Sequence, residues 1–431
     1  MNTGEVSKMW RIDLGINIRS GAHYTQFQVW DLDGDGKAEI ACKTADGTVD
    51  GEGNVIGDIS KDYRNSSGYV LDGPEYFTVF DGETGKALDT VDYIPARGTV
   101  AAWGDGYGNR VDRFLSCIAY LDGETPSFIA ARGYYTRTCL TAYNFKNGKI
   151  ETEWIFDTDV AGSEYEAQGN HSVAVADIDG DGRDEIIYGG LVVDHDGTVK
   201  YSTGLGHGDA QHTSDWMPSN QGLEIMSVHE HTDAEYQVEI RDAETGEILS
   251  GFFTGKDTGR GMAADVDPTY EGAEYWSSAE WNGTIGGLYS SMSTMDDLVK
   301  ISDTTPSVNF SLYWDGDLLA ELQNHTFNDK NGNYYPVSTN VTKWDYENNE
   351  SVTLFESSDI LTSNGTKGNV GLVADIIGDW REEIIARTSD GENDKIRIYS
   401  TAIETDYAIP TFMDDHEYRL GVAWQLSLIH I

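Results

Sequence analysis

Basic residues are scarce in this sequence, with 29 Lys and Arg against 74 Asp and Glu and a formal net charge of −45. No run rich in Lys or Arg interrupts the acidic excess, which argues against nucleic acid as a partner. Such an excess of carboxylates repels itself unless solvent, high salt or bound divalent cations neutralise it. Two explanations of the acidic excess are halophilic solvation and calcium binding, and the spacing of the acids must decide between them.

Long apolar runs and cysteines are also scarce. No apolar run approaches the roughly 20 residues of a membrane helix, and no signal peptide precedes Met1, so we expect a soluble chain that does not enter a membrane. The three cysteines, Cys42, Cys117 and Cys139, sit in apolar, strand-like runs without metal-ligand spacing. They are expected to be buried free thiols.

Proline is rare (8), whereas glycine (48), tyrosine (24) and tryptophan (11) are abundant. This balance favours an all-β fold of short strands joined by tight turns. A hairpin pattern, in which an apolar pair, a turn with Asp or Asn and Gly, and another apolar strand follow one another, recurs about every 50 residues. The copies lie at 79–86, 143–148, 194–197, near Asp296, and at 240–247, 344–349 and 397–400.

This repeat predicts a β-propeller with about seven complete blades, because helical periodicity is absent between the hairpins. Residues 10–15 resemble the closing strand of one more blade, so the chain is expected to begin inside a blade. No linker or shift in composition interrupts the sequence. We therefore expect a single domain over residues 1–431.

Two nine-residue loops, at 31–39 and 177–185, place carboxylates at positions 1, 3, 5 and 9 and a backbone carbonyl at position 7. An oxygen-only ligand set suits calcium, and looser versions lie at 265–274 and 375–383. A loop of this kind is usually structural and identifies no activity. The predicted ligands are Asp31, Asp33, Asp35, Lys37, Glu39, Asp177, Asp179, Asp181, Arg183, Glu185, Asp265, Asp267, Glu274, Asp375, Asp379 and Glu383.

Longer stretches carry a more specific signal. They are GAHYTQF (21–27), KTADGTVDG (43–51), WGD (103–105), YGNRVDRF (107–114), GNH (169–171), YSTGLGHGDA (201–210), GRGMAAD (259–265), WDGDLL (314–319), NGTK (364–367) and GDWREE (378–383). In this order, from Trp10 to Gln425, the sequence resembles the rhamnogalacturonan lyases of polysaccharide lyase family 11.

The resemblance implies an eight-bladed propeller with several calcium ions and an active site at one mouth, where calcium meets a galacturonate carboxylate. The implied substrate is rhamnogalacturonan I of pectin, whose rhamnose-(1→4)-galacturonate bond is cleaved by β-elimination. It also implies an extracellular or periplasmic location, and we expect a monomer. The implied site residues are Lys367, Arg260, His171 and His207 for catalysis, Asn364, Gly365 and Thr366 for substrate binding, and Asp209 and Glu230 near the metal centres.

β-Elimination explains why these residue types belong together. Removing the hydrogen on C5 of galacturonate builds charge on its carboxylate, which a calcium ion and a cationic side chain stabilise. Lys367 serves as the base if burial and nearby calcium lower its pKa, whereas Arg260 suits a carboxylate clamp because a guanidinium stays charged. The sequence leaves these two roles exchangeable.

Three departures and two other classes remain. The family pattern begins with a further blade segment that has no counterpart here, and residues 426–431 match nothing in the family, so we expect both ends to be incomplete. An enlarged loop is expected at 328–333. The competing classes are a non-catalytic calcium-bound propeller that binds glycan or protein, and a glycosidase that uses two carboxylates. The combination of residues 364–367 with Arg260 and His207 favours the lyase.

Overall fold

The structure of the chain is a computed structural model, and it describes residues 8–19, 24–279, 286–330, 333–362, 368–388 and 395–428. The chain forms two compact units, residues 1–166 and residues 167–431. Each unit consists almost entirely of four-stranded antiparallel sheets, which confirms the all-β fold that the composition predicts. The three cysteines are buried and free, which confirms that prediction.

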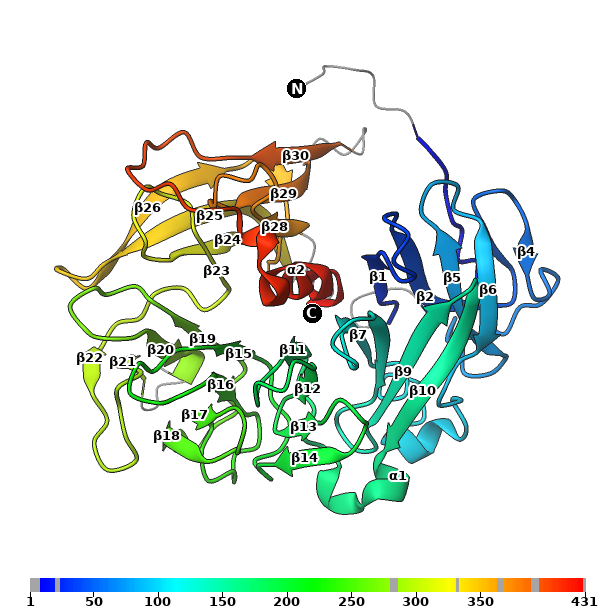
Figure 1. Cartoon of the computed structure of the whole chain (residues 1–431), viewed down its shortest axis with the longest axis horizontal. Coiled ribbons are helices and arrows are strands. Elements are labelled where there is room, and N and C mark those ends of the chain that lie inside the picture. Colours follow the sequence, from blue (N-terminus) through cyan, green and yellow to red (C-terminus); the bar gives the residue numbers. More distant parts are fainter. Residues whose placement is uncertain are drawn as a thin grey trace. The chain divides into compact units, whose positions relative to one another are not determined.

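The first unit contains two of these sheets (Figure 1). The first sheet is formed by β1 (Phe27–Trp30), β2 (Glu39–Ala45), β5 (Glu75–Asp81) and β6 (Ala87–Asp92), and the second by β7 (Phe114–Ala119), β8 (Ser127–Arg132), β9 (Cys139–Lys146) and β10 (Lys149–Asp157). The short pair β3 (Thr48–Val49) and β4 (Val55–Ile56), and the helices η1 (Val100–Trp103), α1 (Thr158–Ala161) and η2 (Ser163–Tyr165), lie in the connections.

The second unit contains five sheets. They are β11 (Ala174–Ala176), β12 (Glu185–Tyr188), β13 (Leu191–Val193) and β14 (Val199–Ser202); β15 (Gln211–Ser214), β16 (Glu224–Val228), β17 (Val238–Asp242) and β18 (Ile248–Phe252); β19 (Gly261–Ala264), β20 (Glu274–Ser277), β21 (Leu288–Ser290) and β22 (Lys300–Ser302); β23 (Phe310–Leu312), β24 (Glu321–Lys330), β25 (Asn333–Asp345) and β26 (Glu350–Ser357); and β27 (Ile360–Leu361), β28 (Leu372–Ala374), β29 (Glu383–Thr388) and β30 (Ile396–Tyr399). In the last sheet β29 pairs with the other three strands.

Apolar cores lie between successive sheets of the second unit. One core combines Met226 and Ile240, from β16 and β17, with Ala263, Tyr275 and Tyr289 of the next sheet. Three further cores join the other neighbouring sheets in the same way. Sheets that lie between two of these cores are therefore buried on both faces. Burial of apolar area contributes about 25 cal/mol per Å² to holding neighbouring sheets together.

The predicted hairpins are present in nearly identical form. The N–H of Asp81 donates to Lys86 O and that of Asp242 donates to Glu247 O, both at 2.9 Å. Thr84 Oγ1 and Thr245 Oγ1 each donate to the preceding aspartate at 2.6 Å. The copy expected at 397–400 is wrong, because Ile396–Tyr399 is strand β30. The enlarged loop expected at 328–333 is also wrong for its described part, where the long hairpin of β24 and β25 continues to Lys330 and resumes at Asn333.

Seven sheets give seven blades, and the eight-bladed expectation is not confirmed in the part of the chain that the structure describes. The supposed remnant at 10–15 forms no strand of a blade. Asp13 instead makes an isolated bridge to Val49, and Trp10 Nε1 donates to Gly82 O at 2.9 Å. These residues lie against the first sheet's own turn, because Gly85 leaves room for the indole.

The second unit ends in η4 (Phe412–Asp414) and helix α2 (His416–Leu428), which lies beside β28 and β11 (Figure 1). Gln425 pairs with the backbone N–H and C=O of Val373 at 3.0 and 2.8 Å, so the helix covers the edge of β28. Tyr418 donates to Glu382 at 2.7 Å and accepts from the N–H of Asp375 at 2.9 Å. No helix among the described residues has the length and apolar character to cross a membrane.

Candidate active site

In six of the seven sheets, a glutamate at the start of one strand organises the turn that precedes that strand. In the sheet of β19 and β20, Glu274 accepts hydrogen bonds from the N–H groups of Val266 and Asp267 at 2.9 and 3.0 Å. The equivalent residues are Glu39, Glu185, Glu224, Glu321 and Glu383. Four of these turns, those before Glu39, Glu185, Glu274 and Glu383, carry predicted metal ligands.

The loop at 31–39 brings together the carboxylates of Asp31, Asp33 and Glu39, whose oxygen atoms lie within 4.8 Å of one another. Asp31 also accepts from the N–H groups of the loop's own residues at 2.8 to 3.0 Å. Positions 1, 3 and 9 therefore converge as the spacing predicts. Asp35 is not part of this group, and the Lys37 side chain pairs with Glu83 at 2.5 Å.

The loop at 177–185 repeats this geometry with Asp177, Asp179 and Glu185. A second group in the same loop joins Asp181 and Glu185 to His195, a residue that the sequence did not point to. The side chain of Arg183, the predicted carbonyl donor, lies 2.8 Å from His195. This loop therefore contributes to two groups of possible metal ligands, whereas its spacing predicts one.

The looser loops are arranged differently. At 265–274, Asp267 accepts from the N–H and hydroxyl of Thr269, and Asp265 and Glu274 do not form a three-residue group with it. At 375–383, Asp375 accepts from the Thr411 hydroxyl at 2.7 Å. Asp379 pairs with Arg381 at 2.7 Å and Glu383 holds the turn, so these three acids have partners within the chain.

The turn between β23 and β24 contains a carboxylate cluster that the sequence analysis missed. Asp315, Asp317 and Glu321 converge within 4.8 Å of one another, and the ammonium of Lys343 donates to all three at 2.5, 2.8 and 2.9 Å. Burial acts to lower the pKa of Lys343, but its three carboxylate partners outweigh burial and raise it. A lysine thus occupies the centre of this cluster.

A separate cluster in the second unit contains four predicted residues. His171, His207, Asp209 and Glu230 each offer a ligand atom within 4.8 Å of the others. His171 Nε2 lies 3.1 Å from Asp209 Oδ1, and His207 Nε2 lies 3.8 Å from Glu230 Oε1. The ring of His207 is fixed by a 2.5 Å hydrogen bond to Gly169 O. Both histidines are buried, while the two acids are partly exposed.

Arg260 lies next to this cluster. Its guanidinium donates to Asn309 at 2.9 Å, and burial lowers its pKa while the charge of Asp209 partly offsets that effect. Burial and the nearby Arg260 also lower the pKa of His325 to about 4, so His325 is neutral at pH 7. Neither Asn309 nor His325 was identified from sequence, because they come from the next sheet along the chain.

The expected substrate contacts Asn364, Gly365 and Thr366, and the expected base Lys367, lie outside the described residues. The next residue, Gly368, is described and packs on His325. A Cβ built at Gly368 would come 1.8 Å from His325 Nδ1, and its φ of +69° also favours glycine. This close approach places Gly368 beside His325, the residue that neighbours Arg260.

Asp209, Arg260 and Asn309 line one side of a cavity of about 1050 Å³ in the second unit. Arg260, Asn309 and Asp209 stand just before β19, β23 and β15, which are the first strands of their sheets. The acidic turns follow those strands. An inner strand of three or four residues is roughly 10–13 Å long. The histidine cluster and the acidic turns therefore occupy opposite ends of the sheets in this unit.

The donor atoms fit divalent cations. The loops at 31–39 and 177–185 offer only oxygen in their three-carboxylate groups, which suits calcium, while the histidine cluster mixes imidazole and carboxylate donors. Burial, aided by the neighbouring aspartates, raises the pKa of Glu39 to about 7 and that of Glu185 to about 8. A bound cation would offset this mutual repulsion.

The family model described as "Rhamnogalacturonan lyase family 11, C-terminal domain" matches residues 3–428. Rhamnogalacturonan exolyase YesX of Bacillus subtilis is 55% identical over 419 residues, which are 97% of this chain and 67% of that protein. Rhamnogalacturonan endolyase YesW of the same organism is 53% identical over 421 residues, 97% of this chain and 64% of that protein.

Solved structures agree. The crystal structure of the exotype lyase YesX matches with a TM-score of 0.91 and 54% identity, and a family 11 lyase of Bacillus licheniformis with 0.89 and 55%; in each case 98% of this chain covers 68% of the other. This chain thus spans about two thirds of the length of these relatives, which are polysaccharide lyases. Because the family model matches residues 3–428 of its 431 residues, the chain belongs to rhamnogalacturonan lyase family 11.

Proposed function

We propose that this chain cleaves the rhamnose-(1→4)-galacturonate bond of rhamnogalacturonan I by β-elimination and leaves a 4,5-unsaturated galacturonate end. The observation that carries the proposal is Arg260, a half-buried cation held by Asn309 at a cavity beside the histidine cluster. In an acidic chain of this family, such a fixed cation suits a uronate carboxylate.

The chemistry requires charge stabilisation more than a strong base. When a base takes the proton from C5, the electron pair left behind spreads onto the carboxylate attached to C5. That pair then forms the C4–C5 double bond as the C4–O bond to rhamnose breaks, and the departing oxygen takes up a proton. Arg260 is already oriented, so it stabilises the carboxylate without reorganisation at the moment of reaction.

His171, His207, Asp209 and Glu230 are the residues that would hold a cation at this site. When bound, a calcium ion supplies further positive charge to the substrate carboxylate. We assign the base to Lys367 and the clamp to Arg260, because Arg260 is tied to Asn309 and Asp209 and a clamp needs a fixed charge.

The test mixes purified protein with rhamnogalacturonan I and follows the ultraviolet absorbance of the unsaturated product, first in calcium and then in excess chelator. We expect product in calcium, little in chelator, and a loss of at least about 10²-fold in rate for Lys367→Ala. Lys86→Ala is the matched control, because the Lys86 side chain is half exposed and its ion pair with Glu52 is long, at 4.0 Å.

Each outcome has a defined meaning. Calcium-dependent product that is lost in Lys367→Ala and kept in Lys86→Ala supports both the reaction and the assignment of the base. Product that persists in Lys367→Ala would reject Lys367 as the base. A folded, calcium-loaded protein that binds the polymer without forming product would be a binding propeller and not a lyase.

A further inference from the structure

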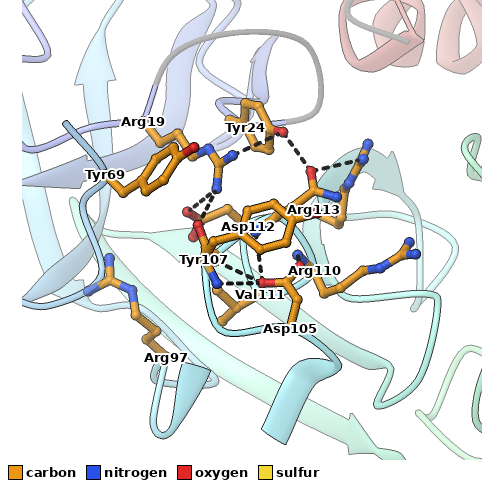
Figure 2. Close-up of polar contacts among 12 residues, drawn as sticks. Arg19, Tyr24, Tyr69, Arg97, Asp105, Tyr107, Arg110, Val111, Asp112 and Arg113 are labelled. Carbon is orange, nitrogen blue, oxygen red and sulfur yellow. Dashed lines mark hydrogen bonds and ion pairs between the residues drawn. The ribbon is translucent and has the colours of Figure 1, made fainter. Parts of the chain in front are cut away.

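The first unit contains a group of arginine and tyrosine side chains that the reaction above does not use. Figure 2 shows Arg19, Tyr24, Tyr69, Tyr107, Arg110 and Arg113 gathered around the loop that precedes β7. Only 29 of the 431 residues are basic, and the chain carries a net charge of −45. A local concentration of cations on such a chain calls for an anionic partner.

The loop that carries Arg110 is rigidly built. The carboxylate of Asp105 accepts hydrogen bonds from the N–H groups of Tyr107, Gly108, Asn109 and Arg110 at 2.8 to 3.2 Å. These four bonds direct the Asp105 carboxylate toward the backbone N–H groups of its own loop and not toward the arginines. They also fix the backbone position of Arg110 before any ligand arrives, which reduces the entropy lost on binding.

Arg19 is held across this loop. Its guanidinium lies 4.1 Å from the centre of the Tyr24 ring and 3.7 Å from Asp112 (Figure 2). Gly108 makes the approach possible, because a Cβ there would come 3.1 Å from Arg19 Nη1 and 2.6 Å from Leu71, and because its φ is +87°. Arg19 therefore supplies a positioned charge.

Arg110 differs from its neighbours. Its guanidinium stacks on Tyr135, 3.4 Å from the ring centre, and forms no hydrogen bond or ion pair with the residues that the structure describes. Arg113 by contrast donates to Asn109 at 3.0 Å and to Tyr134 at 3.4 Å. A planar guanidinium on an aromatic ring keeps its donor edge available for a two-point contact with a carboxylate.

Two features point to a sugar as the bearer of that carboxylate. Tyr69 and Tyr107 are 39% and 50% exposed with ring centres 6.4 Å apart, and tyrosine rings provide apolar faces on which sugar rings stack. Arg113 also stands directly before the inner strand β7, as Arg260 stands directly before β19 in the other unit. Each lies at the same end of its own sheet.

We propose that this arginine–tyrosine surface is a second carbohydrate subsite that binds a uronate carboxylate of the polysaccharide through Arg110, with Arg19 and Arg113 supplying the positive field. The inference rests on the proposed function for the identity of the sugar chain. It adds a binding role for the first unit that is independent of the chemistry at Arg260.

The experiment measures binding of trigalacturonate, which carries uronates but lacks the bond that the lyase is proposed to cleave, by titration calorimetry. The fully methyl-esterified trisaccharide, which has no carboxylate charge, is the matched ligand. We expect Arg110→Ala to weaken trigalacturonate binding about tenfold and to leave binding of the ester unchanged. Arg64→Ala is the control, because Arg64 is an exposed arginine of the same unit paired with Asp62.

Equal affinities of wild type and Arg110→Ala for trigalacturonate would overturn the subsite, as would an equal loss for both ligands. Arg110→Gln, with a near-ultraviolet circular dichroism spectrum, covers the case in which the alanine variant does not fold. Lyase activity measured on the same preparations separates the two proposals. Wild type that forms no product but binds trigalacturonate through Arg110 refutes the lyase and keeps the subsite.

Discussion

Arg260 shows how a single residue acquires its role from its surroundings. It is half buried and hydrogen-bonded to Asn309, the charge of Asp209 acts to raise its pKa, and its own charge adds to burial in lowering the pKa of His325. Asn309 thus fixes the position of the guanidinium, and Asp209 partly offsets the effect of burial on its pKa. Lysine provides a charge of the same sign but cannot make the same planar, two-point contact.

We therefore expect Arg260→Lys to lower kcat/KM on rhamnogalacturonan I by about 10²-fold, the size of effect seen when one oriented donor to a developing charge is lost. Initial rates of unsaturated product formation give the value, with Arg64→Lys as a matched change at an exposed ion pair. A rate for Arg260→Lys within about threefold of wild type would mean that charge alone is sufficient and that the geometry at Asn309 is not used.

At the scale of the turn, Lys343 lies among three carboxylates that converge as those of the loop at 31–39 do. Its ammonium touches Asp315, Asp317 and Glu321, and Glu321 is almost fully buried. The turn is therefore neutralised from within the chain. Removing the lysine leaves three converging carboxylates with no partner charge, which is costly when one of them is buried.

Lys343→Gln should destabilise the chain by about 3 kcal/mol in chelator, and calcium should restore much of this loss because the cluster then resembles the three-carboxylate groups at 31–39 and 177–185. Thermal melts in chelator and in calcium measure both effects. Lys149→Gln is the control, since Lys149 forms an exposed pair with Asp89. A calcium shift in Lys343→Gln no larger than in wild type would show that the cluster cannot accept the ion.

The elements also show what the sequence could and could not predict. The seven hairpins and the two acidic loops are local patterns, so spacing located all but the last hairpin correctly. Lys343 lies far along the chain from Asp315, and no local pattern links them. The histidine cluster gathers residues from three separate segments, so it was predicted from the family resemblance and not from spacing. The stacking of Arg110 on Tyr135 is visible only in the structure.

Over the whole molecule, the buried carboxyl groups predict how stability changes with pH. Burial raises the pKa of Glu39 to about 7 and those of Glu185 and Glu274 to about 8, against 4.5 for an ordinary glutamate. The folded chain thus keeps protons that the unfolded chain loses, so stability falls as pH rises between these values. Glu75, whose pKa is lowered by Lys43, Arg132 and Arg97 despite its burial, acts in the opposite sense but only below about pH 4.5.

In chelator, we expect the melting temperature to decrease steadily from about pH 5 to about pH 8. Excess calcium should reduce this slope, because the ion replaces the protons on the acidic loops. Melts followed by circular dichroism at several pH values measure both slopes, and Glu185→Gln, which removes one of the titrating groups, should flatten the curve in chelator. A melting temperature that rises over this range in chelator would contradict the assignment.

In the second unit, the acidic turns and the histidine cluster lie at opposite ends of the sheets, which has a consequence for sequence divergence. The acidic turns and the histidine cluster lie about 10 Å or more apart, separated by the inner strands, and substitutions at that distance usually add without interfering. One end of a blade can therefore hold a lysine among its carboxylates, as the turn at Asp315 does, while the residues at the other end keep their positions. The fold leaves its anchoring and its chemistry free to vary separately.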